Sequence, residues 1–259
     1  MIHTNLPDYI LQVKCVTKTY GDLTAVHVNS IDIAYGEKVA ILGSSGSGKT
    51  TLLNMIGAVT APSEGSILLE GTPISELQPG RTLSQLVGFI HQRFDLVQNL
   101  NVVNNVLAGK LGQWNLLKSI ISLVTPREVE IAIKALDRVV LPNKLRVRVS
   151  KLSGGEQQRV AIARLLVQDP KLIIADEPVS SLDPTRARNI INLLSDISSE
   201  SSKTLIASIH SVELAKQYFN RIIGLKKGEV QFDVPTNLFT DAMLDDLYNL
   251  SPDILNEPL

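Results

Sequence analysis

The chain has 259 residues, a net charge of -1 at pH 7 and one cysteine, Cys15. This length suits one large α/β domain or a core with an inserted subdomain. The near-zero charge gives no bulk electrostatic reason to expect nucleic acid or an anionic membrane surface as a partner, and a single cysteine excludes an intramolecular disulfide. No basic stretch precedes an apolar core near the N-terminus, and no window reaches the roughly 18 apolar residues of a spanning helix. We therefore expect a protein of the reducing cytoplasm that does not cross a membrane by itself.

Short apolar runs separated by turn signals fill the N-terminal part of the chain. Residues 10–38 contain such runs, with turns at Gly21-Asp22 and Tyr35-Gly36-Glu37, and residues 65–71 add another. These runs predict antiparallel strands. The apolar run 39–42 predicts a further strand, which leads directly into a glycine-rich loop.

That loop, Gly43-Ser44-Ser45-Gly46-Ser47-Gly48-Lys49-Thr50, fits the phosphate-binding P-loop pattern. Its glycines allow backbone N–H groups to approach phosphate oxygens, and a helix beginning near Lys49 points its positive dipole end at the same charge. Lys49 is expected at the β- and γ-phosphates, Thr50 at a Mg²⁺ ion and Thr51 near the α-phosphate. The alternative is a surface loop rich in glycine and serine. We expect the whole segment from Gly43 to Thr51 to bind a nucleotide.

Helical spacing dominates from about residue 98 to residue 168. Thr125-Pro126-Arg127-Glu128 combines an N-cap, a proline at the first helical position and a capping-box glutamate. Behind it lies an apolar stripe that we expect to be core: Val129, Ala132, Ile133, Leu136 and Val140. The pattern predicts a helical subdomain, about residues 93–168, inserted into the core.

From residue 171 to 226 the pattern returns to strands alternating with helices. The continuous apolar runs 172–175 and 204–209 are typical of parallel strands covered on both faces, and a helix is expected at 184–198 between them. The expected fold is an α/β P-loop NTPase core with a mostly parallel sheet, an antiparallel β-subdomain and an inserted α-helical subdomain.

Two carboxylates, Asp176 and Glu177, follow the run 172–175 at the carboxyl end of a strand, where open α/β sheets bind ligands. We expect Asp176 to hold Mg²⁺ through its water shell and Glu177 to orient or deprotonate the attacking water. The alternative is a solvated acidic turn before Pro178.

A second glycine-containing element, Leu152-Ser153-Gly154-Gly155-Glu156-Gln157-Gln158-Arg159, also precedes a helix. Ser153 and Glu156 predict a capping box, and the two glycines expose helix N–H groups that can bind an anion. This element resembles the signature motif of ABC-transporter ATPases. In that family the signature of one subunit closes on ATP held by the P-loop of the other, so the resemblance implies a head-to-tail dimer of this chain.

Further motifs of the family can be matched in order. Tyr20 matches the aromatic residue that stacks on adenine, Gln92 the Mg²⁺-sensing glutamine that faces the membrane partner, Ser180 to Asp183 the D-loop, and His210 the switch histidine at the γ-phosphate. Each has a simpler alternative: core for Tyr20, a solvated loop for Gln92 and a structural role for His210. The resemblance implies ATP and Mg²⁺ as cofactors. It assigns catalysis to Lys49, Glu177 and His210, the metal to Thr50, Gln92 and Asp176, and further nucleotide contacts to Ser153, Gly154, Gly155 and Asp183.

The resemblance covers about residues 11–248, and part of it is to one subfamily rather than to the whole superfamily. The stretch 106–112, with the apolar residues 114–123 behind it, is similar to an insertion of phosphonate-importer ATPases. Near the end of the chain, residues 210–215, 221–225 and 247–248 also follow the pattern of that subfamily. Residues 114–124 suit either ordinary packing or a docking face for a permease. We expect one ABC ATPase domain at 9–248 and assign no function to the tail at 249–259.

The resemblance implies the ATP-hydrolysing subunit of an importer for phosphonate or a related phosphorus oxyanion such as phosphite or a phosphate ester. Its implied partners are a second copy of the chain, permease subunits that hold it at the cytoplasmic face of the plasma membrane and, indirectly, a substrate-binding protein, with no nucleic acid. One alternative is the ATPase of a system that exports or extracts lipid, lipoprotein or macrolide. The other is a soluble ABC ATPase acting on DNA or ribosomes, which usually carries long coiled coils or two ATPase halves that this chain lacks.

Overall fold

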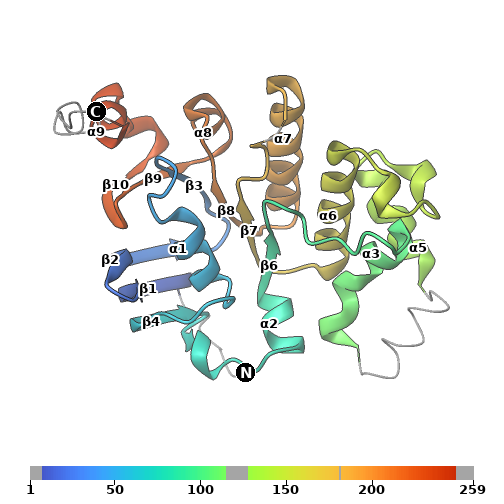
Figure 1. The fold of residues 1–259 in the computed structure, drawn as a ribbon, viewed down its shortest axis with the longest axis horizontal. Coiled ribbons are helices and arrows are strands. Elements are labelled where there is room, and N and C mark those ends of the chain that lie inside the picture. The colour runs from blue at the N-terminus through green and yellow to red at the C-terminus, as the bar shows by residue number, and fades with distance from the viewer. Residues whose placement is uncertain (1–7, 115–127, 181, 249–259) are drawn as a thin grey trace, which may run out of the picture.

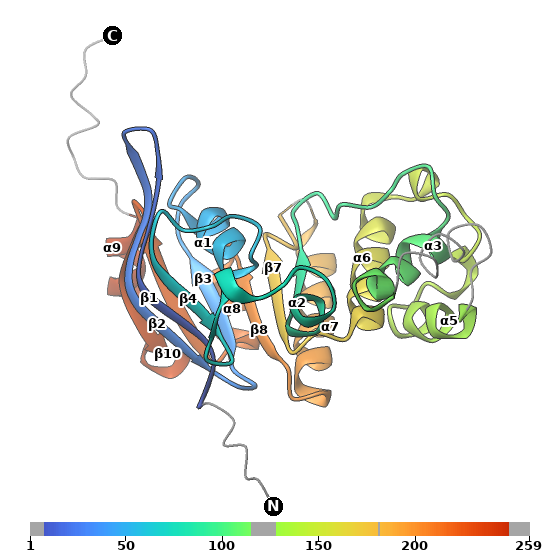
Figure 2. The same cartoon turned by 90° about the horizontal axis from the view of Figure 1, so that it is seen from below.

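The fold was analysed in a computed structural model that describes residues 8–114, 128–180 and 182–248. A twisted, mostly parallel sheet lies in the middle of the molecule (Figure 1). An antiparallel sheet lies on one side of it, and a group of helices lies on the other side (Figure 2). This arrangement confirms the predicted fold class. None of the helices in the described ranges is long and apolar enough to span a membrane.

The antiparallel sheet has the strand order β2-β1-β4-β5. Its long hairpin joins β1 (Tyr9–Tyr20) to β2 (Leu23–Ala34) through Gly21 and Asp22, so the turn expected there is present. Strands β4 (Glu64–Leu69) and β5 (Thr72–Pro73) complete the sheet. The predicted antiparallel strands are therefore confirmed.

The six-stranded sheet has the order β10-β9-β3-β8-β7-β6. The strands are β3 (Lys38–Leu42), β6 (Val87–Ile90), β7 (Leu172–Asp176), β8 (Thr204–Ser208), β9 (Arg221–Lys226) and β10 (Glu229–Pro235). All neighbours pair in parallel except β10 with β9. Every residue of β7 and β8 is buried, as their continuous apolar sequence predicted.

The two faces of this sheet belong to two hydrophobic cores because successive side chains of a strand point to opposite faces. Val39 and Ile41 of β3 pack with α1 (Lys49–Ile56) and the antiparallel sheet, which places α1 between the two sheets. Ala40 and Leu42 pack on the opposite face with α7 (Pro184–Glu200) and α8 (Val212–Tyr218). Strand β3, which leads into the P-loop, therefore contributes side chains to both cores.

The helices beyond the sheet come from the segment predicted to be helical. They are α3 (Val102–Leu107), α5 (Val129–Arg138) and α6 (Gly154–Gln168), with 3-10 turns at Ala108–Gln113, Pro142–Lys144 and Val149–Lys151. They pack against one another and belong to the same hydrophobic core as α7 and α8. The remaining described helices are α2 (Arg81–Leu86) and α9 (Asp241–Tyr248), with 3-10 turns at Ile74–Glu76 and Thr236–Leu238. The limits 9–248 and 93–168 remain predictions, and the tail at 249–259 lies outside the described residues, as does most of the segment 114–124.

The beginning of α5 differs from the prediction. Residues 125–127 lie outside the described part, but Glu128 precedes α5 with φ 65°, so it is not the third residue of a helix. The predicted stripe is also partly wrong, because Ile133 and Val140 are 41% and 74% exposed. The buried residues of this region are instead Ala132, Ala135, Leu136 and Val139. The helix ends at Arg138, which removes Val140 from its helical phase.

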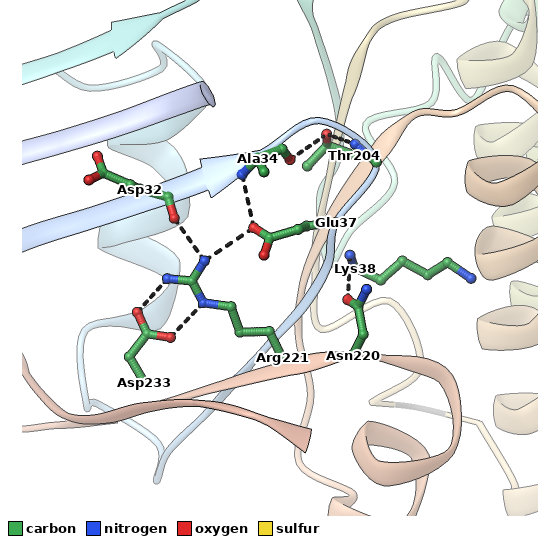
Figure 3. A network of polar contacts seen from close by, with 9 residues as sticks. Asp32, Ala34, Glu37, Lys38, Thr204, Asn220, Arg221 and Asp233 are labelled. Atoms are coloured by element: carbon green, nitrogen blue, oxygen red, sulfur yellow. Dashed lines mark hydrogen bonds and ion pairs between the residues drawn. The ribbon is translucent and has the colours of Figure 1, made fainter. Parts of the chain in front are cut away.

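The two sheets are tied together at the edge where the parallel strands begin (Figure 3). The Arg221 guanidinium donates two hydrogen bonds to the Asp233 carboxylate at 2.6 Å each. It also donates to the Asp32 carbonyl at 2.7 Å and to Glu37 Oε2 at 3.1 Å. These hydrogen bonds and ion pairs raise the Arg221 pKa above its usual value, with Asp233 the largest cause. Because Asp32 belongs to β2 and Asp233 to β10, Arg221 fixes the antiparallel sheet against the parallel one.

Candidate nucleotide-binding site

The P-loop lies between β3, which ends at Leu42, and α1, which begins at Lys49, as predicted. Its glycines are needed for close packing. A Cβ on Gly43 would lie 2.2 Å from the Leu225 carbonyl oxygen, and one on Gly48, where φ is 101°, would lie 2.7 Å from the Ala25 carbonyl oxygen. Larger residues are therefore excluded at both positions, which keeps the loop backbone compact against β9 and β2.

Lys49 is drawn into this loop. The side chain is 4% exposed, and its ammonium donates to the carbonyl oxygens of Gly43 at 2.9 Å and Ser44 at 2.8 Å. Burial lowers the Lys49 pKa, while the negative charges of Glu177 and Asp176 act in the opposite direction. A buried cation beside exposed loop N–H groups is a suitable partner for the negative oxygens of a polyphosphate.

A pocket of about 620 Å³ opens over the P-loop, within the range of small-molecule sites. Predicted site residues make up most of its wall: Ser45, Gly46, Gly48, Lys49, Thr50, Thr51, Gln92 and Glu177. The other described lining residues were not predicted as part of the site: Leu23, Thr24, Ala25 and Lys227. The P-loop, Gln92 and Glu177 thus share one cavity of a size suited to a small-molecule ligand.

Asp176 and Glu177 are held by a residue that sequence reasoning missed. Ser208 Oγ donates to Asp176 Oδ1 at 2.7 Å and accepts the Glu177 backbone N–H at 2.8 Å. Ser208 is fully buried, Asp176 is 4% exposed, and Glu177 has a left-handed φ of 46°. Ser208 is the register partner of Asp176 at the end of β8. A polar residue within the apolar run 204–209 was the signal in the sequence that could have identified it.

Two predicted residues, His210 and Gln92, contact the Glu177 carboxylate. His210 Nε2 lies 2.7 Å from Glu177 Oε1, and Gln92 Nε2 donates to Glu177 Oε2 at 3.0 Å. Gln92 follows β6 while His210 follows β8, so both flank the end of β7 in the sheet order. A carboxylate oriented from two sides at the mouth of a phosphate pocket can accept a proton from an attacking water.

The predicted signature residues form no part of this pocket. Ser153 begins α6 with the capping box that the sequence predicted: its Oγ accepts the Glu156 N–H at 3.3 Å, and Glu156 Oε2 accepts the Ser153 N–H at 2.9 Å. A Cβ added to Gly154 or Gly155 would meet nothing within 4 Å. Packing within this copy therefore does not require these glycines, unlike Gly43 and Gly48, and their surface is open to another molecule.

Tyr20 and Asp183 are also not among the described residues that line this pocket. Tyr20 ends β1 with 54% of its surface exposed, and the Lys18 ammonium lies 5.2 Å from its ring centre. Asp183 is the N-cap of α7, where its carboxylate accepts the Arg186 N–H at 3.0 Å. The D-loop residue Ser181, between Ser180 and Asp183, lies outside the described residues.

The chemistry of the donor set fits Mg²⁺ held jointly with a nucleotide. Thr50 and Gln92 line the pocket, and Asp176 ends the neighbouring β7, which supplies oxygen ligands of the kind that Mg²⁺ accepts through one or two side chains and several waters. Within residues 8–114, 128–180 and 182–248, no group of three or more His, Cys, Asp or Glu side chains is arranged to hold a metal ion alone. A site of this type therefore depends on phosphate oxygens to complete the coordination.

Comparison with known proteins agrees with this geometry. The sequence profile of the ABC transporter family matches residues 26–180, from β2 through the P-loop and the signature to the D-loop. The chain belongs to the ABC transporter family. It is an ATPase of that family, so the predicted family resemblance is confirmed.

Curated relatives match this ABC ATPase over most of its length. A phosphonates import ATP-binding protein, PhnC 2 of Oceanobacillus iheyensis, is 40% identical over 242 residues, covering 92% of this chain and 95% of the relative. The corresponding PhnC of Pseudomonas fluorescens is 44% identical over 220 residues, covering 84% of this chain and 83% of the relative. Among solved structures, a dimeric ATP-binding cassette in a post-hydrolysis state with ADP and Pi is 31% identical with a TM-score of 0.74, covering 88% of this chain and 100% of that one.

Proposed function

We propose that this ABC ATPase powers uptake of phosphonate or a related phosphorus oxyanion through a membrane permease. The observation that carries the proposal is the similarity to phosphonate-import ATP-binding proteins, which extends over 92% of the chain rather than over the shared ATPase motifs alone. A substrate-binding protein would deliver the cargo on the far side of the membrane, and this subunit would dock on the permease at the cytoplasmic face.

The residues gathered at the pocket would divide the reaction between them. Lys49 would neutralise the β- and γ-phosphates, with the backbone from Gly43 to Thr51 around them. Bound Mg²⁺, held by Thr50, Gln92 and Asp176, would supply charge neutralisation at the phosphates. Glu177, held by His210 and Gln92, would take the proton of the attacking water, and His210 would also contact the γ-phosphate.

A second copy of the chain would complete the site. Ser153, Gly154, Gly155 and Asp183 do not line the described pocket, yet they expose helix N–H groups and a carboxylate suited to contacts with a nucleotide. The dimeric cassettes among the similar solved structures support a dimer of this chain, and the family resemblance implies that its two copies pair head-to-tail. Tyr20, exposed at the end of β1, would stack on the adenine ring.

The cargo is tested by reconstituting the chain in liposomes with its native permease and binding protein. Saturating the binding protein with a phosphonate is expected to stimulate ATP hydrolysis and concentrate the phosphonate in the lumen faced by the ATPase. A Glu177→Gln version of the complex is the matched control, because glutamine keeps the size and shape of the side chain but cannot act as the base. A native membrane partner with a large extracytoplasmic domain, and no response to phosphonate, phosphite or phosphate esters, would contradict the proposal.

A further inference from the structure

A second lysine, Lys227, faces the nucleotide pocket from an element outside the P-loop. It lies in the two-residue turn that joins β9 to β10 and lines the same pocket of about 620 Å³ as Lys49. Lys227 is exposed, and within the described part of the chain no ion pair or side-chain hydrogen bond occupies it. Its ammonium is therefore available to a ligand in that pocket.

The turn is fixed against the P-loop by backbone contacts. The Gly228 N–H donates to the Ser47 carbonyl at 2.9 Å, and the Gly228 carbonyl accepts the His27 N–H at 2.8 Å. A Cβ on Gly228 would lie 2.7 Å from the Ala25 carbonyl oxygen, so the turn approaches β2 as closely as Gly48 of the P-loop does. Lys227 is thus held at the rim of the phosphate site by rigid neighbours.

Turn chemistry does not account for a lysine at this position. Lys227 and Gly228 have φ values of 50° and 84°, and two-residue hairpin turns with positive φ at both positions favour Asn-Gly, Asp-Gly or Gly-Gly. A lysine in the left-handed region is disfavoured because its Cβ approaches the following carbonyl. A side chain kept in a disfavoured backbone conformation beside a binding pocket points to a role in binding.

We propose that Lys227 is a nucleotide-binding residue whose ammonium donates hydrogen bonds to the polyphosphate of ATP and ADP in the pocket that Gln92 and Glu177 also line. The inference rests on the proposed nucleotide site and extends it to the β9–β10 turn. The pocket wall next to Lys227, from Leu23 to Ala25, leads from the turn after Tyr20 to the P-loop. Lys227 therefore contacts the phosphates nearest the nucleoside, which ADP and ATP share.

The test uses substitutions that suit the turn but change the charge. Lys227→Asn and Lys227→Asp both create dipeptides favoured in this turn, so the melting temperature is expected to stay equal or rise. Affinity for ADP and ATP, measured by calorimetry on the full chain, is expected to fall about fivefold for Lys227→Asn and further for Lys227→Asp. Lys227→Arg is expected to bind like the wild type, and adenosine binding is expected to change in none of them.

Two controls separate the outcomes. Lys226→Gln removes the same charge one residue away, where the side chain bonds the Asp246 carbonyl, and should leave nucleotide affinity unchanged. Lys49→Ala tests the proposed site itself. If Lys49→Ala loses affinity while Lys227→Asn and Lys227→Asp bind as the wild type, the inference about Lys227 is overturned and the proposed site stands. If Lys49→Ala binds like the wild type, the proposed site fails first.

Discussion

Replacing Ser208 by alanine should damage both the stability and the turnover of this ATPase, because one hydroxyl bonds both the Asp176 carboxylate and the Glu177 backbone N–H. The substitution removes the bond from Ser208 Oγ to Asp176 at 2.7 Å and the bond from the Glu177 N–H to Ser208 at 2.8 Å. The first bond has a charged partner and contributes about 1.5–3 kcal/mol to stability, and the second is an ordinary hydrogen bond that contributes about 0.5–1.5 kcal/mol. Because Ser208 and Asp176 are buried, water cannot replace these bonds, and we expect a loss of about 2–4 kcal/mol.

Two measurements together test this expectation. Urea unfolding gives the change in stability, and steady-state ATP hydrolysis should show kcat reduced about tenfold or more with KM altered much less, since a misplaced Glu177 affects the transition state. Ser198→Ala is the matched control: it removes a buried serine in α7 that bonds the Lys203 carbonyl, so it should cost stability without lowering kcat at a temperature where the protein is folded. An unchanged kcat in Ser208→Ala, or an equal fall in Ser198→Ala, would refute the reasoning.

Two other predictions concern the fold. Arg221→Lys should lower the free energy of unfolding by about 2 kcal/mol, because a lysine cannot pair with Asp233 in bidentate fashion and still reach Asp32. The control is Arg138→Lys at the exposed ion pair with Glu200, which should change the free energy of unfolding by less than about 0.5 kcal/mol. Equal effects of the two substitutions would contradict the role of Arg221. Tyr35→Phe should remove part of the alkaline loss of stability. Burial, helped by a 3.0 Å hydrogen bond to Glu70, raises the Tyr35 pKa from 10.0 to about 12, so its stabilising contribution is complete below pH 10 and is lost as pH rises to about 12. Denaturation curves of both proteins at stepped pH should therefore converge over that window, and parallel curves would count against it.

Local sequence patterns predicted the parts of the site that depend on neighbours in the chain. The P-loop, the capping box at Ser153 and the strand ending in Asp176 each follow from residues a few positions apart, whose chemistry is set by helix ends, glycines and apolar runs. Gln92 and His210 were predicted as site residues by the family resemblance alone. They contact Glu177 because β6, β7 and β8 are parallel neighbours that end at the same edge of the sheet.

Long-range packing decided what the sequence did not reveal. Ser208 looked like one residue of a buried strand, and its role depends on the register of β8 against β7. No local pattern singles out Lys227, which reaches the pocket because the β9–β10 turn bonds the P-loop at Ser47. At α5 the apolar spacing predicted Ile133 and Val140 as core, but the tertiary contacts of the helix bury Ala135 and Val139 instead.

The most direct test of the account is the mass of the Glu177→Gln protein in solution with and without ATP and Mg²⁺, measured by light scattering. The account predicts a monomer without nucleotide and a dimer with ATP, because hydrolysis no longer opens the shared sites. Adding Ser153→Arg should prevent the dimer while each chain still binds ATP at its own P-loop. A Glu177→Gln protein that binds ATP and stays monomeric, or a dimer that survives Ser153→Arg, would contradict the claim that two copies of this chain share each ATP site.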